Sequence, residues 1–203
     1  DPQGREAFRQ QHQLAERFVV MYAGNHSPCH PLDTLLEAAR RLSDRKEIVF
    51  LFVGGGSEQE KVKAFGLRHG LENIRCLPYQ PVENLAATLS AADLHSVVMG
   101  DGFVGIVHPS KIYNLLTIGS PFLYVGPKES HVTEIAGRIN GNGSAFIARN
   151  GDVDAVVGHI LKQSKLEPPL KRNLVPEIAD SFSKKTLLPR MIALLESSTE
   201  SRV

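Results

Sequence analysis

The chain has 203 residues, 42% of them hydrophobic and 22% charged, which is ordinary for a globular protein and excludes wholesale disorder, a collagen-like repeat or a coiled coil. At about 150 residues per domain, this length predicts one domain, either alone or with an appendage. Lysine plus arginine number 23 against 22 aspartate plus glutamate, and a net charge of +1 argues against a nucleic-acid binder driven by bulk charge.

Short apolar runs alternate with segments of helical periodicity along the chain. The strands that this pattern predicts are residues 18–22, 48–53, 74–77, 94–98, 122–125 and 145–148. The helices that it predicts are residues 32–42, 58–69, 82–89, 110–117, 132–139 and 153–163, with a further helix over 184–195 in the tail. The glycines at 54–56 are expected to end the second strand. This order of elements predicts an α/β fold, a Rossmann-like three-layer α/β/α arrangement around a mostly parallel sheet of about six strands.

The two cysteines, Cys29 and Cys76, lie far apart and form no Cys-x-x-Cys pair, so we expect reduced thiols in a cytosolic protein. The first residues are polar and charged, which does not fit a signal peptide, and no apolar run in the sequence approaches the length of a membrane span. The chain begins with Asp1 instead of methionine, as expected of a fragment or a processed product.

Ligands of open parallel sheets bind at the carboxyl ends of the strands, which directs attention to residues 23–31, 54–57, 78–83 and 99–111. In the first of these loops, Gly24 lets a ligand approach the backbone, and the helix that begins near residue 31 offers free N–H groups to an anion. His26 and His30 can add hydrogen bonds, or charge when protonated. The alternatives are a turn with exposed histidines or, more weakly, a metal site that includes Cys29.

The last of these loops carries the clearest signal for an anion. Ser110 is a candidate helix N-cap, and Lys111 in the first turn opposes the helix dipole. A cation beside free N–H groups is expected where an anion, most naturally phosphate, docks on both; the alternative is a solvated surface lysine. His108 is expected to lie outside the chemistry, and His95 to be a hydrogen-bonded core residue. The glycines at 54–56 fit neither a dinucleotide fingerprint nor a Walker loop, and they either form a simple turn or line a cleft.

Six short motifs occur in a fixed order: Tyr-Ala-Gly-Asn at 22–25, Phe-Val-Gly-Gly-Gly at 52–56, Leu-Pro-Tyr-Gln-Pro at 77–81, Leu-Ser-Ala-Ala-Asp at 89–93, Pro-Ser-Lys-Ile-Tyr at 109–113 and Ile-Gly-Ser-Pro-Phe at 118–122. Together they resemble the C-terminal half of bacterial family 4 glycosyltransferases, which have the GT-B fold of two Rossmann-like domains facing across a cleft. The resemblance covers about residues 18–163. It implies an interdomain linker remnant at 1–17, a nucleotide-sugar-binding domain at 18–165 and a C-terminal helical tail at 166–203.

The resemblance also implies an activity: a retaining glycosyltransferase of the hexosyltransferase type that moves a sugar from a nucleoside diphosphate sugar to an acceptor hydroxyl. UDP is the commonest donor nucleotide, and the nucleotide-sugar is a substrate, so neither a cofactor nor a metal is expected. The acceptor, a glycan or lipid-linked glycan, would bind an N-terminal domain that this chain lacks, and the chain alone would be inactive. The family-level setting is polysaccharide or lipopolysaccharide assembly, in the cytoplasm or at the inner face of a bacterial membrane.

Residue by residue, the resemblance gives Lys111 and, more loosely, Asp101 as the catalytic candidates. The donor-binding candidates are Gly24, Asn25, His26, His30, Gly55, Tyr79, Gln80, Glu83, Phe103, Gly105, Pro109, Ser110 and Asn114. Asn25 and His30 stand nearest the places where many members carry Arg and Lys, and Asn114 stands where many carry a glutamate for the ribose. The uncharged Asn25 and Asn114 favour one alternative, a non-catalytic nucleotide-binding module. A second alternative is a nucleotide-sugar epimerase, because such epimerases share the GT-B architecture.

Overall fold

The computed structural model describes residues 1–139, 144–166 and 176–200. In these residues, six strands form one parallel sheet in the order β3-β2-β1-β4-β5-β6. The strands are β1 (Phe18–Asn25), β2 (Ile48–Gly55), β3 (Ile74–Leu77), β4 (Leu94–Val98), β5 (Phe122–Val125) and β6 (Ala145–Ala148). This arrangement confirms the Rossmann-like α/β fold. Strands β2 and β3 lie on one side of β1, and β4, β5 and β6 lie on the other. Rossmann-like folds bind ligands where the strand order changes side, here between β1 and β4.

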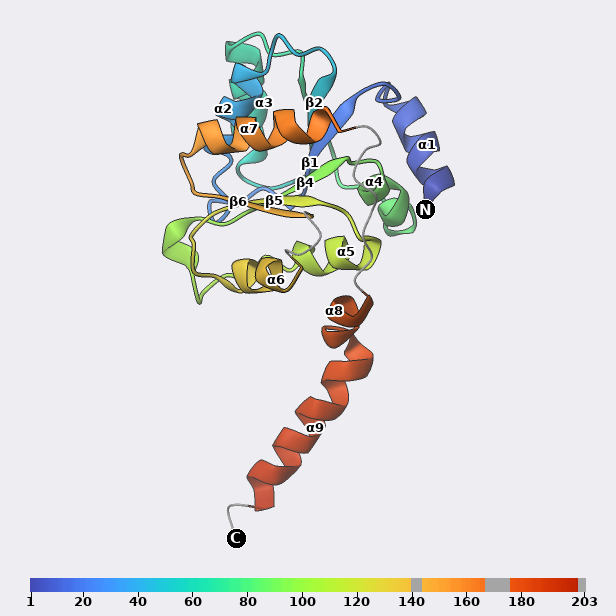
Figure 1. Cartoon of the computed structure of the whole chain (residues 1–203), viewed down its shortest axis with the longest axis vertical. Helices are drawn as coiled ribbons and strands as arrows, with labels where there is room; N and C mark the ends of the chain where they lie inside the picture. The colour runs from blue at the N-terminus through green and yellow to red at the C-terminus, as the bar shows by residue number, and fades with distance from the viewer. Residues whose placement is uncertain (140–143, 167–175, 201–203) are drawn as a thin grey trace.

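Helices cover both faces of the sheet (Figure 1). The α-helices are α1 (Pro2–Gln11), α2 (Asp33–Arg41), α3 (Gln59–Arg68), α4 (Leu85–Ser90), α5 (Lys111–Ile118), α6 (His131–Ile139), α7 (Val153–Ser164), α8 (Pro176–Ser181) and α9 (Lys184–Glu200), with short 3-10 helices η1 (Val82–Asn84) and η2 (Asp101–Phe103). Helices α2, α3 and α7 pack on one face of the sheet, and α1, α4, α5 and α6 on the other.

The central strand β1 is apolar on both sides because both of its faces are covered. Val20 and Tyr22 join the core beneath α2 and α7, whereas Val19 and Met21 join the core beneath α1. The continuous apolar runs of the sequence, without polar alternation, are the pattern of such doubly covered parallel strands.

The glycines at 54–56 do not end β2 where the sequence predicted. Strands β1 and β2 continue to Asn25 and Gly55, and Gly24 pairs with Gly54. Both glycines have a φ near the left-handed range, 132° for Gly24 and 133° for Gly54, and a Cβ on Gly54 would lie 2.0 Å from the Gly24 carbonyl oxygen. Only residues without a side chain allow the two strands to run on side by side here, and they carry Asn25 and Gly55 to the edge of the sheet.

Helix α5 begins at Lys111, and Ser110 occupies the N-cap position as predicted. The expected cap itself is wrong, because the Ser110 backbone is helical and its hydroxyl makes no capping hydrogen bond. The first N–H groups of α5 are therefore not satisfied by a side-chain cap, and they face the carboxyl edge of the sheet.

Residues 1–17, the expected linker remnant, contain a helix that docks on the domain. Arg9 is only 8% exposed and donates to the Ala91 carbonyl at 2.8 Å and to Asp93 Oδ2 at 3.0 Å. Arg5 donates to Asp93 Oδ1 at 2.5 Å, and Asp93 Oδ2 also accepts from the Val19 backbone N–H at 2.7 Å. One carboxylate thus ties α1 to the starts of both β1 and β4.

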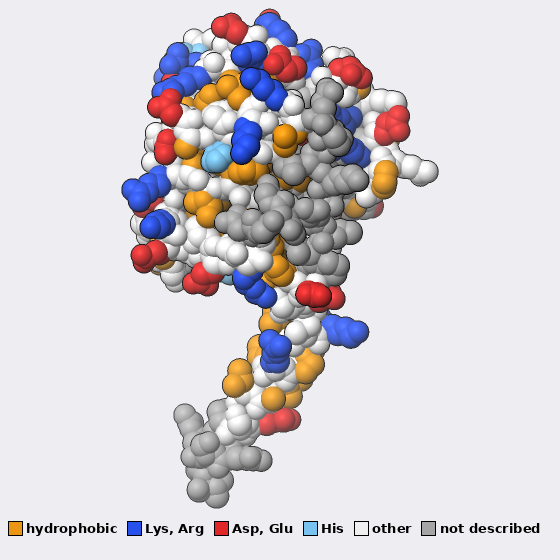
Figure 2. All heavy atoms as spheres, in the orientation of Figure 1, with side chains coloured by type: hydrophobic (Ala, Val, Ile, Leu, Met, Phe, Trp, Pro, Cys, Tyr) orange, Lys and Arg blue, Asp and Glu red, His pale blue; other side chains and the backbone are white. Residues whose placement is uncertain are grey.

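The predicted tail helix over 184–195 is confirmed within α9. Helix α8 packs against α5, and α9 then runs away from the body (Figure 1) with apolar side chains along it (Figure 2). Residues 167–175 and 201–203 of the expected tail lie outside the described residues. Among the helices described, none is long and apolar enough to cross a bilayer.

Candidate functional site

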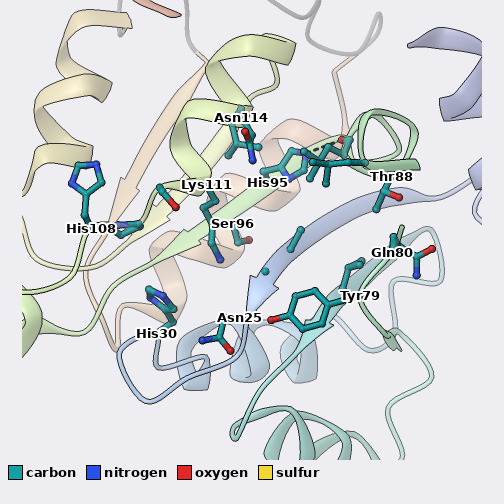
Figure 3. Close-up of a pocket in the computed structure, with 18 residues that line it drawn as sticks. Asn25, His30, Tyr79, Gln80, Thr88, His95, Ser96, His108, Lys111 and Asn114 are labelled. Carbon is teal, nitrogen blue, oxygen red and sulfur yellow. Dashed lines mark hydrogen bonds between the residues drawn. The ribbon is translucent and has the colours of Figure 1, made fainter. Parts of the chain in front are cut away.

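A cavity of about 340 Å³ opens at the carboxyl edge of the sheet, between the ends of β1 and β2, helices α4 and α5, and the segment after β3 (Figure 3). This volume lies within the range of about 300–1,000 Å³ typical of small-molecule sites. The predicted site residues that line it are Gly24, Asn25, His30, Tyr79, Gln80, Pro109, Ser110, Lys111 and Asn114. The predicted residues that lie outside its lining are His26, Gly55, Glu83, Asp101, Phe103 and Gly105.

Lys111 is the most unusual side chain of the cavity. Its Nζ is buried, has no hydrogen-bond partner among the described residues, and lies 3.5 Å from the centroid of the Tyr22 ring. Burial lowers the pKa of this amine from 10.5 to about 7. A solvated surface lysine, the alternative reading of the sequence, is therefore wrong. A buried ammonium without an anionic partner is costly, and an anion in the cavity would supply that partner.

The loop after β1 is held in place by backbone and histidine hydrogen bonds. The His26 backbone N–H donates to the Gly55 carbonyl at 2.7 Å, and the Tyr22 hydroxyl donates to the Asn25 carbonyl at 2.7 Å. His30 Nδ1 lies 2.8 Å from the Val98 carbonyl, so this nitrogen carries the proton and the loop is tied to the end of β4. The backbone that would face an anion is thus fixed before any ligand arrives.

The two histidines of this loop favour the neutral form. Burial, more than any other cause, lowers the pKa of His26 and of His30, and the nearby charge of Lys111 lowers both further. Because His26 is fully buried, a turn with exposed histidines is the wrong description of it. Charge for an anion must therefore come from Lys111, because these histidines would be neutral near pH 7. Within the part of the chain that the structure describes, no three His, Cys, Asp or Glu side chains are grouped to hold a metal ion.

The far end of the cavity has an aromatic and apolar lining. Tyr79 is 60% exposed, its hydroxyl donates to the Gly55 carbonyl at 3.2 Å, and its ring lies over Gly55, so it is not a buried packing residue. Gln80 folds back, with its Nε2 donating to the Pro78 carbonyl at 3.0 Å. Leu85 and other residues of α4 form the opposite wall. An exposed ring over a glycine is a surface on which a planar base can stack.

The segment after β4 does not bring Asp101 to the cavity. Asp101 Oδ1 accepts a hydrogen bond from Asn150 Nδ2 at 3.0 Å, and the ring of Phe103 packs over Gly100. Gly105 has a φ of 76° and lies in the same exposed segment. Asn114, one turn along α5 from Lys111, does line the cavity.

The sequence missed several lining residues: Ala23, Val53, Leu85, Thr88, Leu89, Ser96 and Leu115. His95 is a core histidine as predicted, with Nε2 at 2.9 Å from the Leu89 carbonyl, yet it also lines the cavity. His108 lines it too, stacked on His131 at 3.6 Å between ring centroids and sharing a 2.5 Å hydrogen bond with the Tyr113 hydroxyl. The position of His108 after β4, at the edge where ligands bind, was the one signal that pointed to it.

Residues 4–107, about half of the chain, match the family described as glycosyl transferases group 1. The chain is 29% identical over 183 residues to the putative colanic acid biosynthesis glycosyl transferase WcaI of Escherichia coli (strain K12), covering 90% of this chain and 43% of that protein. It is 26% identical over 117 residues to the probable glycosyltransferase WbjE of Pseudomonas aeruginosa, covering 58% and 29% respectively. The chain thus spans less than half the length of these curated relatives.

The same fold occurs in the crystal structure of Anabaena Alr3699/HepE in complex with UDP-glucose. The TM-score is 0.79 at 19% sequence identity, and the match covers 97% of this chain and 53% of that one. Family and fold agree with each other, and with a sheet whose cavity lies at the carboxyl ends of its strands. The chain belongs to the group 1 glycosyl transferases and has the Rossmann-like architecture of GT-B enzymes.

Proposed function

We propose that the chain is the C-terminal, donor-binding domain of a retaining family 4 glycosyltransferase that takes a hexosyl group from a UDP-sugar. One observation carries the proposal: the buried Lys111 Nζ, without a hydrogen-bond partner among the described residues, stands at the N-terminus of α5 in a cavity at the carboxyl edge of the sheet. An anion that meets both the ammonium and the N–H groups of α5 would offset the cost of burying this charge.

The proposed donor runs along the cavity. Its diphosphate would lie against Gly24, Asn25, Ser110 and Lys111, its ribose against Asn114, and its base against Tyr79 and Gln80. The Anabaena relative of the same fold binds UDP-glucose, which supports UDP as the nucleotide. In the reaction, the bond between the sugar's anomeric carbon and the diphosphate oxygen breaks, the acceptor hydroxyl oxygen bonds to that carbon, and the hydroxyl proton passes to the departing diphosphate. Preorganised N–H groups and the ammonium would stabilise the negative charge that develops on the diphosphate.

The wider assignment rests on the relatives. The name of the Escherichia coli relative supports a role in bacterial polysaccharide assembly, with a glycan or lipid-linked glycan as the acceptor. We infer that the acceptor binds a preceding domain of a longer protein, in the cytoplasm or at the inner membrane face. We further infer that donor binding needs neither a metal nor a cofactor. His26, Gly55, Glu83, Phe103 and Gly105 stay donor-binding predictions, as Asp101 stays a catalytic one.

Titration calorimetry with UDP, GDP and ADP, in buffer that contains EDTA, tests donor binding by this chain. We expect saturable binding of UDP, with GDP and ADP at least about tenfold weaker, a difference of about 1.4 kcal/mol. In Asn114→Ala, the loss of one ribose hydrogen bond should weaken UDP binding about fivefold. Failure of UDP to bind the wild-type chain, or equal binding of all three nucleotides, contradicts the proposal.

Catalysis is expected to require more than this chain. A transferase must close its cleft and exclude water, whereas Tyr79 in the lining of this cavity is 60% exposed. With a UDP-sugar as donor and a lipid-linked glycan as acceptor, we expect transfer by the longer protein and none by residues 1–203 alone. Transfer by this chain alone would contradict the two-domain proposal. UDP binding without transfer by the longer protein would favour the second candidate, a non-catalytic nucleotide-binding module. The observation in favour of this candidate is that Asp101, the second catalytic candidate, pairs with Asn150 and does not line the cavity.

A further inference from the structure

Tyr22 occupies an unusual place beneath the cavity. It lies on β1, is 1% exposed, and is not among the residues that line the cavity. Its ring nevertheless carries the Lys111 ammonium, with 3.5 Å between Nζ and the ring centroid. That distance is well inside the limit of about 6 Å for a cation–π interaction, and the contact is shielded from water, where such interactions are strongest.

Tyr22 also contacts the end of β1, the second segment proposed to face the diphosphate. The Tyr22 hydroxyl donates a 2.7 Å hydrogen bond to the carbonyl of Asn25, at the tip of β1. Burial raises the pKa of this phenol, so the hydroxyl keeps the proton that it donates. The head of Lys111 also lies against the same strand end, since a Cβ on Gly24 would be 3.4 Å from Nζ.

We propose that Tyr22 is a positioning residue for the donor diphosphate: its ring holds the Lys111 ammonium and its hydroxyl holds the Asn25 backbone, so one buried side chain fixes both elements. The inference rests on the proposed function for the identity of the ligand. It adds a residue that touches no part of the donor and that acts through two neighbours from different segments, β1 and α5.

Few other groups compete with the ring for the ammonium. The titratable side chains around the pair are His26, Cys29 and His30 from the loop after β1, and Tyr79 from the segment after β3. In the described part of the chain, no carboxylate forms an ion pair with Lys111. Because burial lowers the pKa of both histidines, they are neutral near pH 7, and the NMR signals of the Lys111 side chain itself follow its own titration.

Two substitutions separate the two contacts. Tyr22→Phe keeps the ring and removes the hydroxyl, whereas Tyr22→Leu removes both. Phe50→Leu is the matched control, because Phe50 is an aromatic residue of the same core cluster, equally buried, on β2. The readouts are the pKa of Lys111 in the free protein, from NMR of its side-chain carbon and nitrogen, and the UDP dissociation constant between pH 7 and 9.

For Tyr22→Phe we expect an unchanged Lys111 pKa and about threefold weaker UDP binding, through loss of one hydrogen bond. For Tyr22→Leu we expect a Lys111 pKa about 1 lower than in the wild type and UDP binding about 10- to 30-fold weaker at pH 7. Phe50→Leu should lose comparable thermal stability while both readouts stay at wild-type values.

The outcomes distinguish this inference from the proposed function. A Lys111 pKa in Tyr22→Leu that equals or exceeds the wild-type value overturns the role of the ring, whether or not UDP binds. Equal weakening of UDP binding by Tyr22→Leu and Phe50→Leu overturns positioning, because it would reflect a structural role only. A wild-type chain that shows the low Lys111 pKa but binds no UDP overturns the proposed function, and with it the assignment of a diphosphate to this pair.

Discussion

Lys111→Met is expected to stabilise the fold and to weaken nucleotide binding strongly in the same variant. Burial lowers the pKa of Lys111 from 10.5 to about 7, so the folded protein holds this ammonium at a cost. Methionine keeps the unbranched apolar chain and removes the charge. At pH 6 the free energy of unfolding should rise by about 2–4 kcal/mol, since a displacement of one pKa unit corresponds to about 1.4 kcal/mol and local relaxation absorbs part of it.

The pH dependence has a definite sign. The folded-state pKa lies below the unfolded one, so between about pH 7 and 10.5 the unfolded chain binds more protons than the folded chain. Wild-type stability from this group therefore rises with pH across that window, and the cost is fully present below pH 7. Urea unfolding at pH 6 and pH 9.5 should show the advantage of Lys111→Met shrinking at the higher pH. Lys128→Met, at an exposed lysine, should change stability by no more than about 0.5 kcal/mol at either pH.

The same substitution should raise the UDP dissociation constant about 30- to 100-fold, because a charge-assisted hydrogen bond to phosphate is lost. A substitution that raises the free energy of unfolding and weakens ligand binding is typical of a residue whose role is in binding. A Lys111→Met protein that is less stable than the wild type at pH 6 would contradict the buried-charge account. Wild-type UDP affinity in this variant would contradict the phosphate-binding role.

Asp93→Ala is expected to destabilise the domain by about 3–5 kcal/mol. The carboxylate accepts from Arg5 and Arg9 and from the Val19 backbone N–H. Its removal leaves the nearly buried guanidinium of Arg9 without a counter-charge, which costs far more than the loss of a surface ion pair. Helix α1 should also detach, and amide hydrogen exchange over residues 2–11 should become faster.

Asp154→Ala is the matched control for that experiment. Asp154 pairs with Arg41, but its side chain is 89% exposed, so its removal should cost less than about 1 kcal/mol. Asp93 lies at the start of β4, at the sheet edge opposite the cavity, so UDP affinity of the folded Asp93→Ala protein should be unchanged. Equal losses of stability in the two variants would contradict the assignment of α1 to the core of this domain.

The bounds of a strand could be predicted from the sequence where local composition alone determines them. Strands β3 to β6 have the bounds that the sequence predicted. Each is a short, mostly apolar segment between helical segments and turn residues, although β3 contains Arg75 and β4 contains His95 and Ser96. The ends of β1 and β2 were missed because glycine normally weakens a strand. Here Gly24 and Gly54 are required by the close approach of two backbones, a contact that no local pattern reveals.

The site could likewise be predicted only where local sequence patterns indicated it. The loop glycine and the residues at the start of α5 follow from rules about strand ends and helix N-termini, and the structure brings Gly24, Asn25, Ser110 and Lys111 to one cavity. The burial of Lys111 depends on Tyr22, which lies 89 positions earlier in the sequence. The two residues meet because β1 and β4 are neighbours in the sheet, and no local pattern reveals that pairing. Likewise, the turn of Asp101 toward Asn150 depends on a partner beyond β6.

The most direct test of the central claim is a UDP titration of the ¹⁵N-labelled chain, followed by NMR. We expect saturable shifts of the backbone amides of Gly24, Asn25 and Lys111, at the end of β1 and the start of α5, with the same midpoint as the calorimetric titration. In Lys111→Met, those shifts should be much smaller at the same UDP concentration, with a midpoint about 30- to 100-fold higher. Shifts confined to residues outside the cavity, or none at saturating UDP, would contradict the claim that this cavity binds the nucleotide diphosphate of a sugar donor.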